Sequence, residues 1–243
     1  MNINTETKNW YKNYYSKFGG NRNDIRTNKG VLYQTLASEV SLVKAVRQIK
    51  QSPLNLLVLD VGCGSGANVF QFLRLNYQIE NITGVDVNDE RLAIAQRIYP
   101  NAHFILGDAS KMQFEDNTFD LVYESGMFAT LPDDTLCKSI ADEMIRVCKV
   151  GGYILLIDWR IPKPNNPNYN ALTKKKLVKF FNVGHQTKLI TMEKGALIPP
   201  IGRFLSKNIP SIYFLVCRIF PFLVGQVAYL LRKQNLTNAK THI

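Results

Sequence analysis

The 243-residue sequence predicts an open, doubly wound α/β sheet, in which parallel strands alternate with helices. Short, uninterrupted apolar segments recur between residues 55 and 158, as expected for strands that are buried on both faces. Segments with helical periodicity separate them, at lengths that suit right-handed crossovers between parallel strands. Apolar residues make up 46% of the chain, which is enough to build a substantial core.

An amphipathic helix is expected first, over residues 31–49, before the apolar segments begin. Its apolar stripe is predicted to consist of residues three and four positions apart: Leu32, Leu36, Val40, Val43 and Val46. Residues 51–53 (QSP) end this helix, since proline disfavours helical backbone in the residue before it.

Five strands and the helices between them follow. The strands are expected at residues 55–61, 81–87, 102–106, 117–124 and 153–158, and the helices at 68–75, 88–100 and 133–150. Asn88 is the expected N-cap of the second of these helices, and Gly151 and Gly152 are expected to end the third. After Arg160, a basic helix is expected at 173–181, followed by strands within 185–197 and at 225–233.

The positive charge is concentrated in the C-terminal part. The chain has a formal net charge of +11, and residues 160–243 hold 14 Lys and Arg but a single acid, Glu193. Such a segment attracts an anionic partner, which could be a nucleotide, a phosphate, a nucleic acid or a membrane surface. The alternative is a solvated basic face that binds nothing.

Residues 209–231 are long and apolar enough to raise the question of a transmembrane span. Arg218 lies near the centre, and Pro210 and Pro221 interrupt the segment, so we expect no span. Shallow contact with an anionic bilayer remains open. The first residues lack an apolar leader and the four cysteines form no C-x-x-C pair, which predicts a cytoplasmic protein, with peripheral contact at the inner face of the membrane as an option.

A glycine-rich turn lies in LVLDVGCGSGANVF (57–70), between an expected strand and an expected helix. The Walker phosphate loop requires a lysine and a hydroxyl residue after its last glycine, and this turn has neither. Gly62, Gly64 and Gly66 are spaced G-x-G-x-G, whereas dinucleotide folds use G-x-G-x-x-G. Asp86 ends the next strand, where a carboxylate can accept from ribose hydroxyls, and Asp108 follows the third.

These features together resemble the class I S-adenosylmethionine-dependent methyltransferases of the small-molecule kind. LDVGCGSG resembles the family's first motif, GVDVND its ribose-binding acid, and residues 107–124 its adenine-side segment and fourth strand. The similarity covers residues 54–160. It implies a seven-stranded, mostly parallel Rossmann-like sheet, whose last strand is antiparallel and inserted between the fifth and sixth. The resulting division is an N-terminal helical cap (1–52), a cofactor-binding core (53–160) and a basic C-terminal part (161–243) that completes the sheet.

The resemblance implies S-adenosylmethionine as cofactor and assigns its contacts. The methionine part and the methyl group are expected beside Asp60, Gly62, Cys63, Gly64, Gly66, Glu124 and Ser125. Asp86 is expected to bind the ribose, Val87 the adenine face, and Asp108 with the Ala109 amide the adenine edge. No metal site is expected.

Catalytic residues are harder to identify, because the cofactor carries an activated methyl group and a base is needed only if the acceptor must lose a proton. Asp158, at the end of the fifth strand, is the candidate base, although a capping or ion-paired role explains it equally well. Tyr14, Tyr15 and Arg26 resemble the lid that relatives fold over the cofactor, and a packing helix would show the same aromatics.

The predicted function is methyl transfer to a small-molecule acceptor, at oxygen, such as a sugar or specialised metabolite. An anionic acceptor would suit the basic C-terminal part. ESGMF (124–128) stands where methyltransferases of amino groups carry [DN]-P-P-[YFW], which argues against base-amino methylation. Three alternatives stay open: an RNA methyltransferase, a membrane-surface enzyme for a lipid-linked or quinone-like substrate, and an interaction protein that keeps only the fold.

Overall fold

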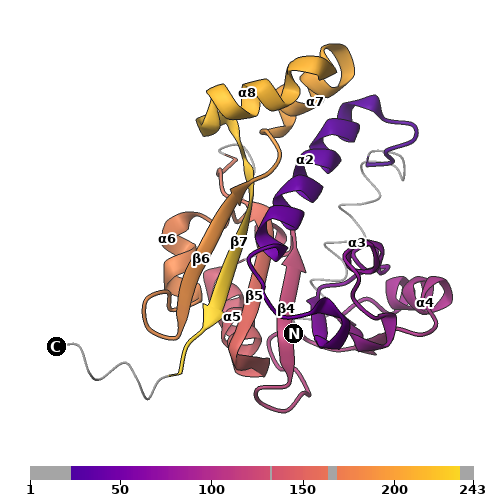
Figure 1. Ribbon diagram of the computed structural model, residues 1–243, viewed down its shortest axis with the longest axis vertical. Helices are drawn as coiled ribbons and strands as arrows, with labels where there is room; N and C mark the ends of the chain where they lie inside the picture. The colour runs from indigo at the N-terminus through magenta and orange to yellow at the C-terminus, as the bar shows by residue number, and fades with distance from the viewer. Residues whose placement is uncertain (1–22, 132, 164–168, 236–243) are drawn as a thin grey trace.

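The computed structural model describes residues 23–131, 133–163 and 169–235. Figure 1 shows one sheet with helices packed on both faces. The seven strands lie in the order β3-β2-β1-β4-β5-β7-β6. They are β1 (Val58–Val61), β2 (Ile82–Asp86), β3 (His103–Leu106), β4 (Phe119–Ser125), β5 (Cys148–Trp159), β6 (Thr187–Lys194) and β7 (Gln226–Lys233).

The predicted fold class is confirmed. Pairs among β1 to β5 are parallel, while β7 runs antiparallel to both β5 and β6, between which it is inserted. The uninterrupted apolar strands are explained by burial on both faces: in β4, Leu121 and Tyr123 pack into one core cluster, and Val122 packs into the other.

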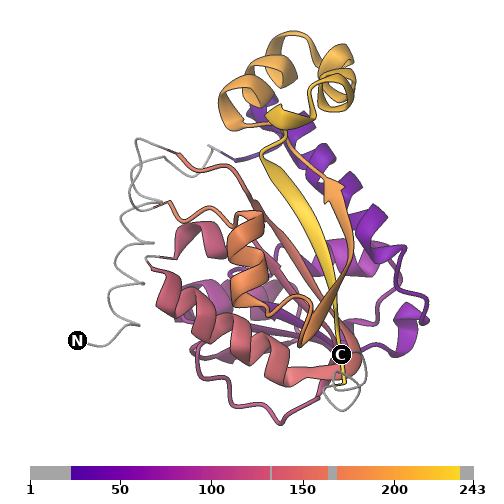
Figure 2. The same cartoon turned by 90° about the vertical axis from the view of Figure 1, so that its left-hand side faces the viewer.

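Helices cover each face of the sheet. On one side lie α2 (Lys29–Val46), α3 (Val69–Arg74) and α4 (Asp89–Ile98), and on the other α5 (Asp134–Val147) and α6 (Lys174–Phe180) (Figure 2). The side chain of Asn88 accepts from the Arg91 amide, so it is the N-cap of α4 as predicted. Asp133 and Thr173 cap α5 and α6 in the same way.

The predicted end of α5 is wrong. The helix ends at Val147, ahead of Gly151 and Gly152, because Cys148 already pairs with Phe119 of β4. Gly151 instead lies within β5, with a φ of +80°, where the pairing with β4 is irregular. A left-handed backbone in the strand favours glycine at this position.

The predicted buried stripe of α2 is also wrong in part. Val40 and Val43 are 40% and 38% exposed, whereas Ala37 and Ala45 are at most 2% exposed. The buried face of α2 combines the small residues Gly30, Ala37, Ser41 and Ala45 with Val31 and Leu42, and it packs against α7, β6 and β7. Apolar spacing alone placed the larger valines inward.

Between β6 and β7 the chain forms α7 (Pro199–Asn208) and α8 (Tyr213–Ile219), with short 3-10 turns after each. We call residues 199–223 the α7–α8 segment. It joins the end of β6 to the start of the antiparallel β7, so it lies beyond the carboxyl edge of the parallel strands, at the top of Figure 1. No helix within the described ranges has both the length and the apolarity needed to cross a bilayer.

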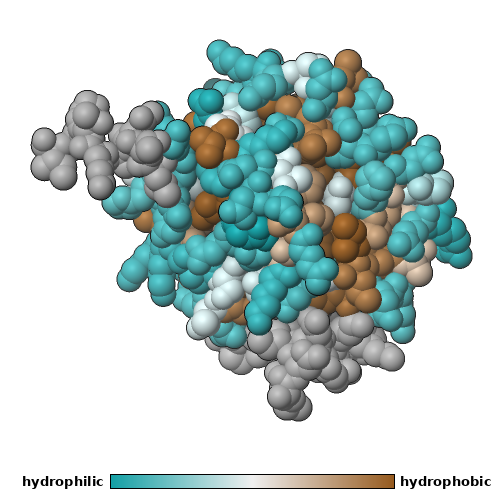
Figure 3. Space-filling view, turned by 90° about the horizontal axis from the view of Figure 1, so that it is seen from below, coloured by the Kyte–Doolittle hydropathy of each residue, from teal (hydrophilic) through white to brown (hydrophobic). Residues whose placement is uncertain are grey.

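The opposite end of the molecule is shown in Figure 3. Hydrophilic side chains cover most of that face, and apolar side chains form a smaller area among them. The two ends of the sheet therefore differ: one carries a helical segment over the strand termini, and the other is closed by turns.

The buried face of α2 can be tested by substitution. Ala45→Leu should lower the free energy of unfolding by about 1–3 kcal/mol, because the site has no room for extra methylenes. The matched change Val43→Ala should alter it by less than about 0.5 kcal/mol, since Val43 is half exposed. Urea denaturation measures both values. A larger loss of unfolding free energy for Val43→Ala than for Ala45→Leu would support the apolar stripe predicted from the sequence.

Candidate functional site

The glycine turn after β1 depends on left-handed backbone. Gly62, Gly64 and Gly66 have φ values of +73°, +54° and +77°, which side chains with a Cβ rarely adopt. The amides of Gly62 and Cys63 both donate to the Val85 carbonyl, at 2.8 and 3.1 Å. The turn is thereby fixed against the end of β2. A Cβ at Gly64 would collide with the guanidinium of Arg91, which lies over the turn.

Asp86 connects the turn to the next strand. One of its carboxylate oxygens accepts from the Gly64 amide at 2.8 Å, and the other accepts from the Asn88 amide at 2.8 Å. The residue is half-buried, so the carboxylate is held in place while part of it remains accessible. A carboxylate has about four acceptor positions, and two protein donors leave capacity for the two hydroxyls of a ribose.

Asp60 lies beneath the turn and is buried. The amide of Asn68 donates to both of its oxygens, at 3.2 and 3.1 Å. Burial raises the pKa of Asp60 to about 7, and the nearby negative charge of Asp86 contributes to the increase. Ionised Asp60 therefore favours a cationic neighbour.

Glu124 and Asp158 form a second buried acidic pair, at the ends of β4 and β5. Burial raises the pKa of Glu124 well above its ordinary value, and the charge of Asp158 raises it further. Oε2 of Glu124 accepts from the Met127 amide at 2.9 Å, whereas Oε1 is buried and has no hydrogen-bond partner among the described residues. An unpaired buried acceptor is costly, so this oxygen is available to a donor that the described residues do not supply.

Asp158 is engaged by the backbone. Its oxygens accept from the Trp159 amide at 2.6 Å and from the Ala129 amide at 3.0 Å, and burial raises its pKa to about 7. These bonds hold the turn after β4 in place, which is the capping role that sequence analysis kept open. The assignment of Asp158 as a base stays a prediction.

The remaining predicted residues lie along the same edge. Asp108 follows β3, and its Oδ1 accepts from both the amide and the hydroxyl of Ser110. Ala109 and Val87 are half-buried, and Ser125 is exposed at the end of β4. Because Val61 pairs with Val85 and Asp86 with Leu106, the ends of β1, β2 and β3 meet at one edge.

The predicted lid stays a prediction, because most of it lies outside the described residues. Tyr14 and Tyr15 lie outside the described residues. Arg26 is 85% exposed in its side chain and pairs with Asp24 two residues away, at 3.2 Å.

Sequence analysis missed Asn68 and Arg91. Asn68 directly precedes α3, where its amide reaches back to Asp60, and Arg91 lies in the first turn of α4. Asn68 could have been found from the sequence, because its side-chain amide follows the buried Asp60 by eight residues across a tight turn. No local pattern signals Arg91, because its approach to the turn depends on how α4 packs.

S-Adenosylmethionine fits this edge. The left-handed backbone of the turn requires glycine, and a Cβ at Gly62 would lie 3.0 Å from the Met127 sulfur. The cofactor carries an ammonium and a sulfonium, which suit the unpaired Glu124 Oε1 and the buried Asp60. Cys63 offers no competing chemistry, because burial raises the pKa of its thiol far above the ordinary value. Among the described residues, no cluster of three His, Cys, Asp or Glu could hold a metal ion.

The raised pKa of Asp60 predicts a pH-dependent stability. An aspartate titrates near 3.8 when unfolded and at about 7 in the folded protein, so between these values the folded state binds more protons and stability falls as pH rises. Relative to wild type, Asp60→Asn should therefore have a lower free energy of unfolding at pH 5 than at pH 8. The expected difference is on the order of a few kcal/mol.

Urea denaturation at the two pH values measures this difference in free energy of unfolding. Glu90→Gln is the control, because Glu90 is exposed at the start of α4 and its replacement should leave the pH profile unchanged. The same effect of Asp60→Asn at both pH values would contradict the assignment.

Residues 58–152 match the model of a family described as a methyltransferase domain. A 2-methyl-6-phytyl-1,4-hydroquinone methyltransferase of Synechocystis sp. is 31% identical over 130 residues, which are 51% of this chain and 39% of that protein. A demethylmenaquinone methyltransferase of Chlorobaculum tepidum is 34% identical over 124 residues, 51% of this chain and 47% of that protein. The matched region therefore spans less than half the length of these curated relatives.

Solved structures share the fold. A protein from Pyrococcus horikoshii superimposes with a TM-score of 0.63 at 17% identity, over 91% of this chain and 99% of that one. A geranyl diphosphate C-methyltransferase from Streptomyces coelicolor, solved with Mg²⁺, geranyl diphosphate and S-adenosyl-L-homocysteine, gives a TM-score of 0.60 at 13% identity, over 82% and 77% of the two chains. In its glycine turn, its acids at three strand ends and its 3-2-1-4-5-7-6 sheet, the chain is similar to the class I S-adenosylmethionine-dependent methyltransferases, and residues 58–152 carry the match to the methyltransferase domain.

Proposed function

We propose that the protein transfers a methyl group from S-adenosylmethionine to a small, amphiphilic acceptor. The observation that carries this proposal is the unpaired Oε1 of Glu124 at the edge where the glycine turn and Asp86 also lie. When bound, the cofactor supplies a methyl group activated by the sulfonium. The protein's part is to orient the two reactants and to exclude water.

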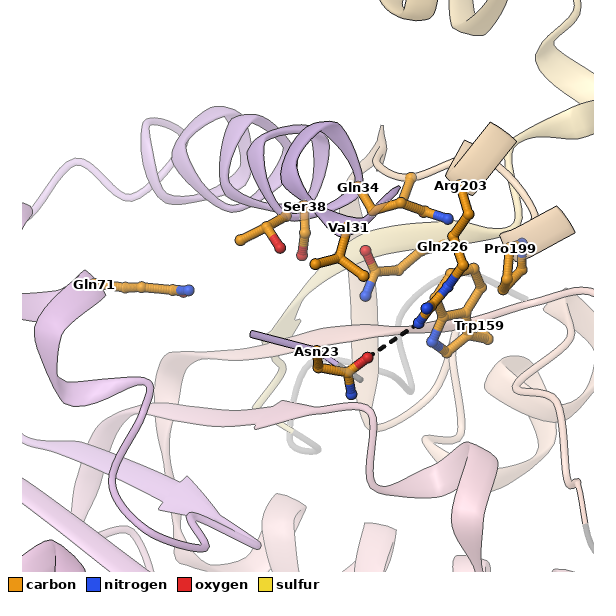
Figure 4. Close-up of a pocket in the computed structure, with 11 residues that line it drawn as sticks. Asn23, Val31, Gln34, Ser38, Gln71, Trp159, Pro199, Arg203 and Gln226 are labelled. Carbon is orange, nitrogen blue, oxygen red and sulfur yellow. Dashed lines mark hydrogen bonds between the residues drawn. The ribbon is translucent and has the colours of Figure 1, made fainter. Parts of the chain in front are cut away.

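A pocket of about 210 Å³ lies against α2 and α7 (Figure 4). Its wall includes Trp159, which directly follows Asp158, and Gln71 of α3 lies on another side. We propose that this pocket receives the acceptor, because Trp159 lies at the carboxyl end of β5. An acceptor in this position would meet the methyl group from the side of the sheet opposite α5.

Polar groups dominate the pocket. Gln34, Gln226 and Arg203 converge in it, and the Arg203 guanidinium donates to the Asn23 side chain at 3.0 Å. Oε1 of Gln226 is buried without a hydrogen-bond partner among the described residues. A hydroxyl or amide donor on the acceptor would satisfy this oxygen, and the positive charge of Arg203 suits an anionic or strongly polar group.

The volume limits what fits inside. Pockets for drug-sized ligands have volumes of roughly 300–1,000 Å³, so 210 Å³ accommodates the polar end of an acceptor and not a long chain. The names of the relatives support an acceptor of this type: two refer to a phytyl hydroquinone and to demethylmenaquinone, and one structural neighbour was solved with geranyl diphosphate. We propose a polar head group with an apolar chain that leaves the pocket along α7. Oxygen stays the predicted acceptor atom.

Replacement of Asp86 tests the cofactor site. Loss of a charged hydrogen-bond acceptor costs about 1.5–3 kcal/mol, so Asp86→Ala should weaken binding of S-adenosylhomocysteine roughly ten- to hundredfold. Calorimetry measures the affinity, and Asp86→Asn repeats the test with less disturbance of the Gly64 amide. Glu90→Ala, an acid four residues later and exposed, is the control. Wild-type affinity in both Asp86 variants would refute the site.

Label transfer tests the acceptor. The protein, S-adenosylmethionine labelled in the methyl group and a cell extract are incubated, and the label is followed into lipid, water-soluble and RNA fractions. We expect it in the lipid fraction. Label in the water-soluble fraction would favour the sugar or metabolite acceptor, and label in RNA would support the alternative of an RNA methyltransferase.

Gln226→Leu then tests the pocket. This change removes the unpaired oxygen, so it should raise KM for the labelled acceptor severalfold and leave S-adenosylhomocysteine affinity unchanged. Gln96→Leu on the exposed side of α4 is the matched control. An unchanged KM for Gln226→Leu would move the acceptor site elsewhere.

A further inference from the structure

The α7–α8 segment exposes seven large apolar side chains. We call this set the apolar ridge; its members are 43–67% exposed: Phe204, Ile209, Phe214, Leu215, Ile219, Phe220 and Phe222. They make up a third of the large apolar residues that are exposed in the described chain, within only 19 positions. A cluster of this density on a surface usually marks an interaction site.

The segment is firmly attached by its other side, so the ridge does not result from loose packing. Tyr213 is fully buried, and its hydroxyl accepts from the Leu197 amide at 3.2 Å. Ser206 accepts from the Tyr33 amide of α2 at 3.1 Å. Arg160 donates to the carbonyls of Val224 and Pro221, both at 2.9 Å. These contacts orient the segment and leave the ridge facing outward.

The charges within the α7–α8 segment have one sign. Lys207 and Arg218 are exposed among its members, and residues 194–243 contain no acid. An apolar surface bordered by cations matches the interface of an anionic bilayer, where apolar side chains enter the head-group region and Lys or Arg attract lipid phosphates. An apolar protein partner would tolerate acidic residues beside the ridge, so the lack of acids in residues 194–243 favours an anionic membrane.

We infer that the apolar ridge docks the protein on an anionic membrane surface. Phe204, Leu215 and Phe222 enter the head-group layer, while Lys207 and Arg218 contact the phosphates. The α7–α8 segment borders the pocket through Pro199 and Arg203, so docking would place the pocket near the lipid. The inference deepens the proposed function, but its test requires no catalysis and can succeed or fail separately from that function.

The test is cosedimentation of the full chain with vesicles of phosphatidylcholine alone or mixed with phosphatidylglycerol. We expect binding to the mixed vesicles and little to phosphatidylcholine. The double change Lys207→Glu and Arg218→Glu should lower the partition coefficient at least roughly twentyfold, because each basic residue near the surface contributes roughly fivefold. Lys188→Glu, on exposed β6, controls for net charge and should have a clearly smaller effect.

Phe222→Ser should also weaken binding to mixed vesicles, whereas Phe70→Ser, at a similarly exposed phenylalanine on α3, should not. A retained thermal shift with S-adenosylhomocysteine shows that each variant is folded. Equal binding to both vesicle types, or wild-type binding by the ridge variants, would overturn the inference. Sedimentation velocity supplies the last check: a dimer that Phe222→Ser dissociates would show that a second copy covers the ridge.

Discussion

The structure depends on one constraint. Parallel strands bring their carboxyl ends to a single edge of the sheet, and the chain must leave the end of β1 without covering that edge. The glycine turn solves this problem by left-handed backbone at three alternate positions. The Gly64 amide donates to the Asp86 carboxylate, and this hydrogen bond joins the glycine turn directly to the end of β2. The cofactor assignment, the position of the pocket and the orientation of the α7–α8 segment all follow from that edge.

The same edge concentrates negative charge at a cost. Burial of Asp60, Glu124 and Asp158 raises the pKa of each group, so their ionised forms are unfavourable until a cation is nearby. S-Adenosylmethionine brings two positive centres. If these groups contact the cofactor as proposed, its binding free energy and their protonation are linked.

Much of this arrangement could be predicted from the sequence, because strands buried on both faces and a glycine turn have strong local signals. The sheet class and the placement of Asp60, Asp86 and Asp108 on one edge followed from strand order alone. Features that depend on packing could not be predicted. Apolar spacing suggested Val40 and Val43 as the inner face of α2, but the packing against α7 and the sheet buries Ala37, Leu42 and Ala45 instead. Arg91 reaches the turn only through the packing of α4.

The central claim is that the glycine turn and the strand-end carboxylates bind one adenosyl ligand together. A crystal structure of the protein with S-adenosylhomocysteine tests it most directly. The account predicts that the ribose hydroxyls donate to Asp86 and that the amino group lies within hydrogen-bond distance of Oε1 of Glu124. A ligand bound away from the carboxyl edge, or one that leaves Oε1 of Glu124 without a donor, would contradict it.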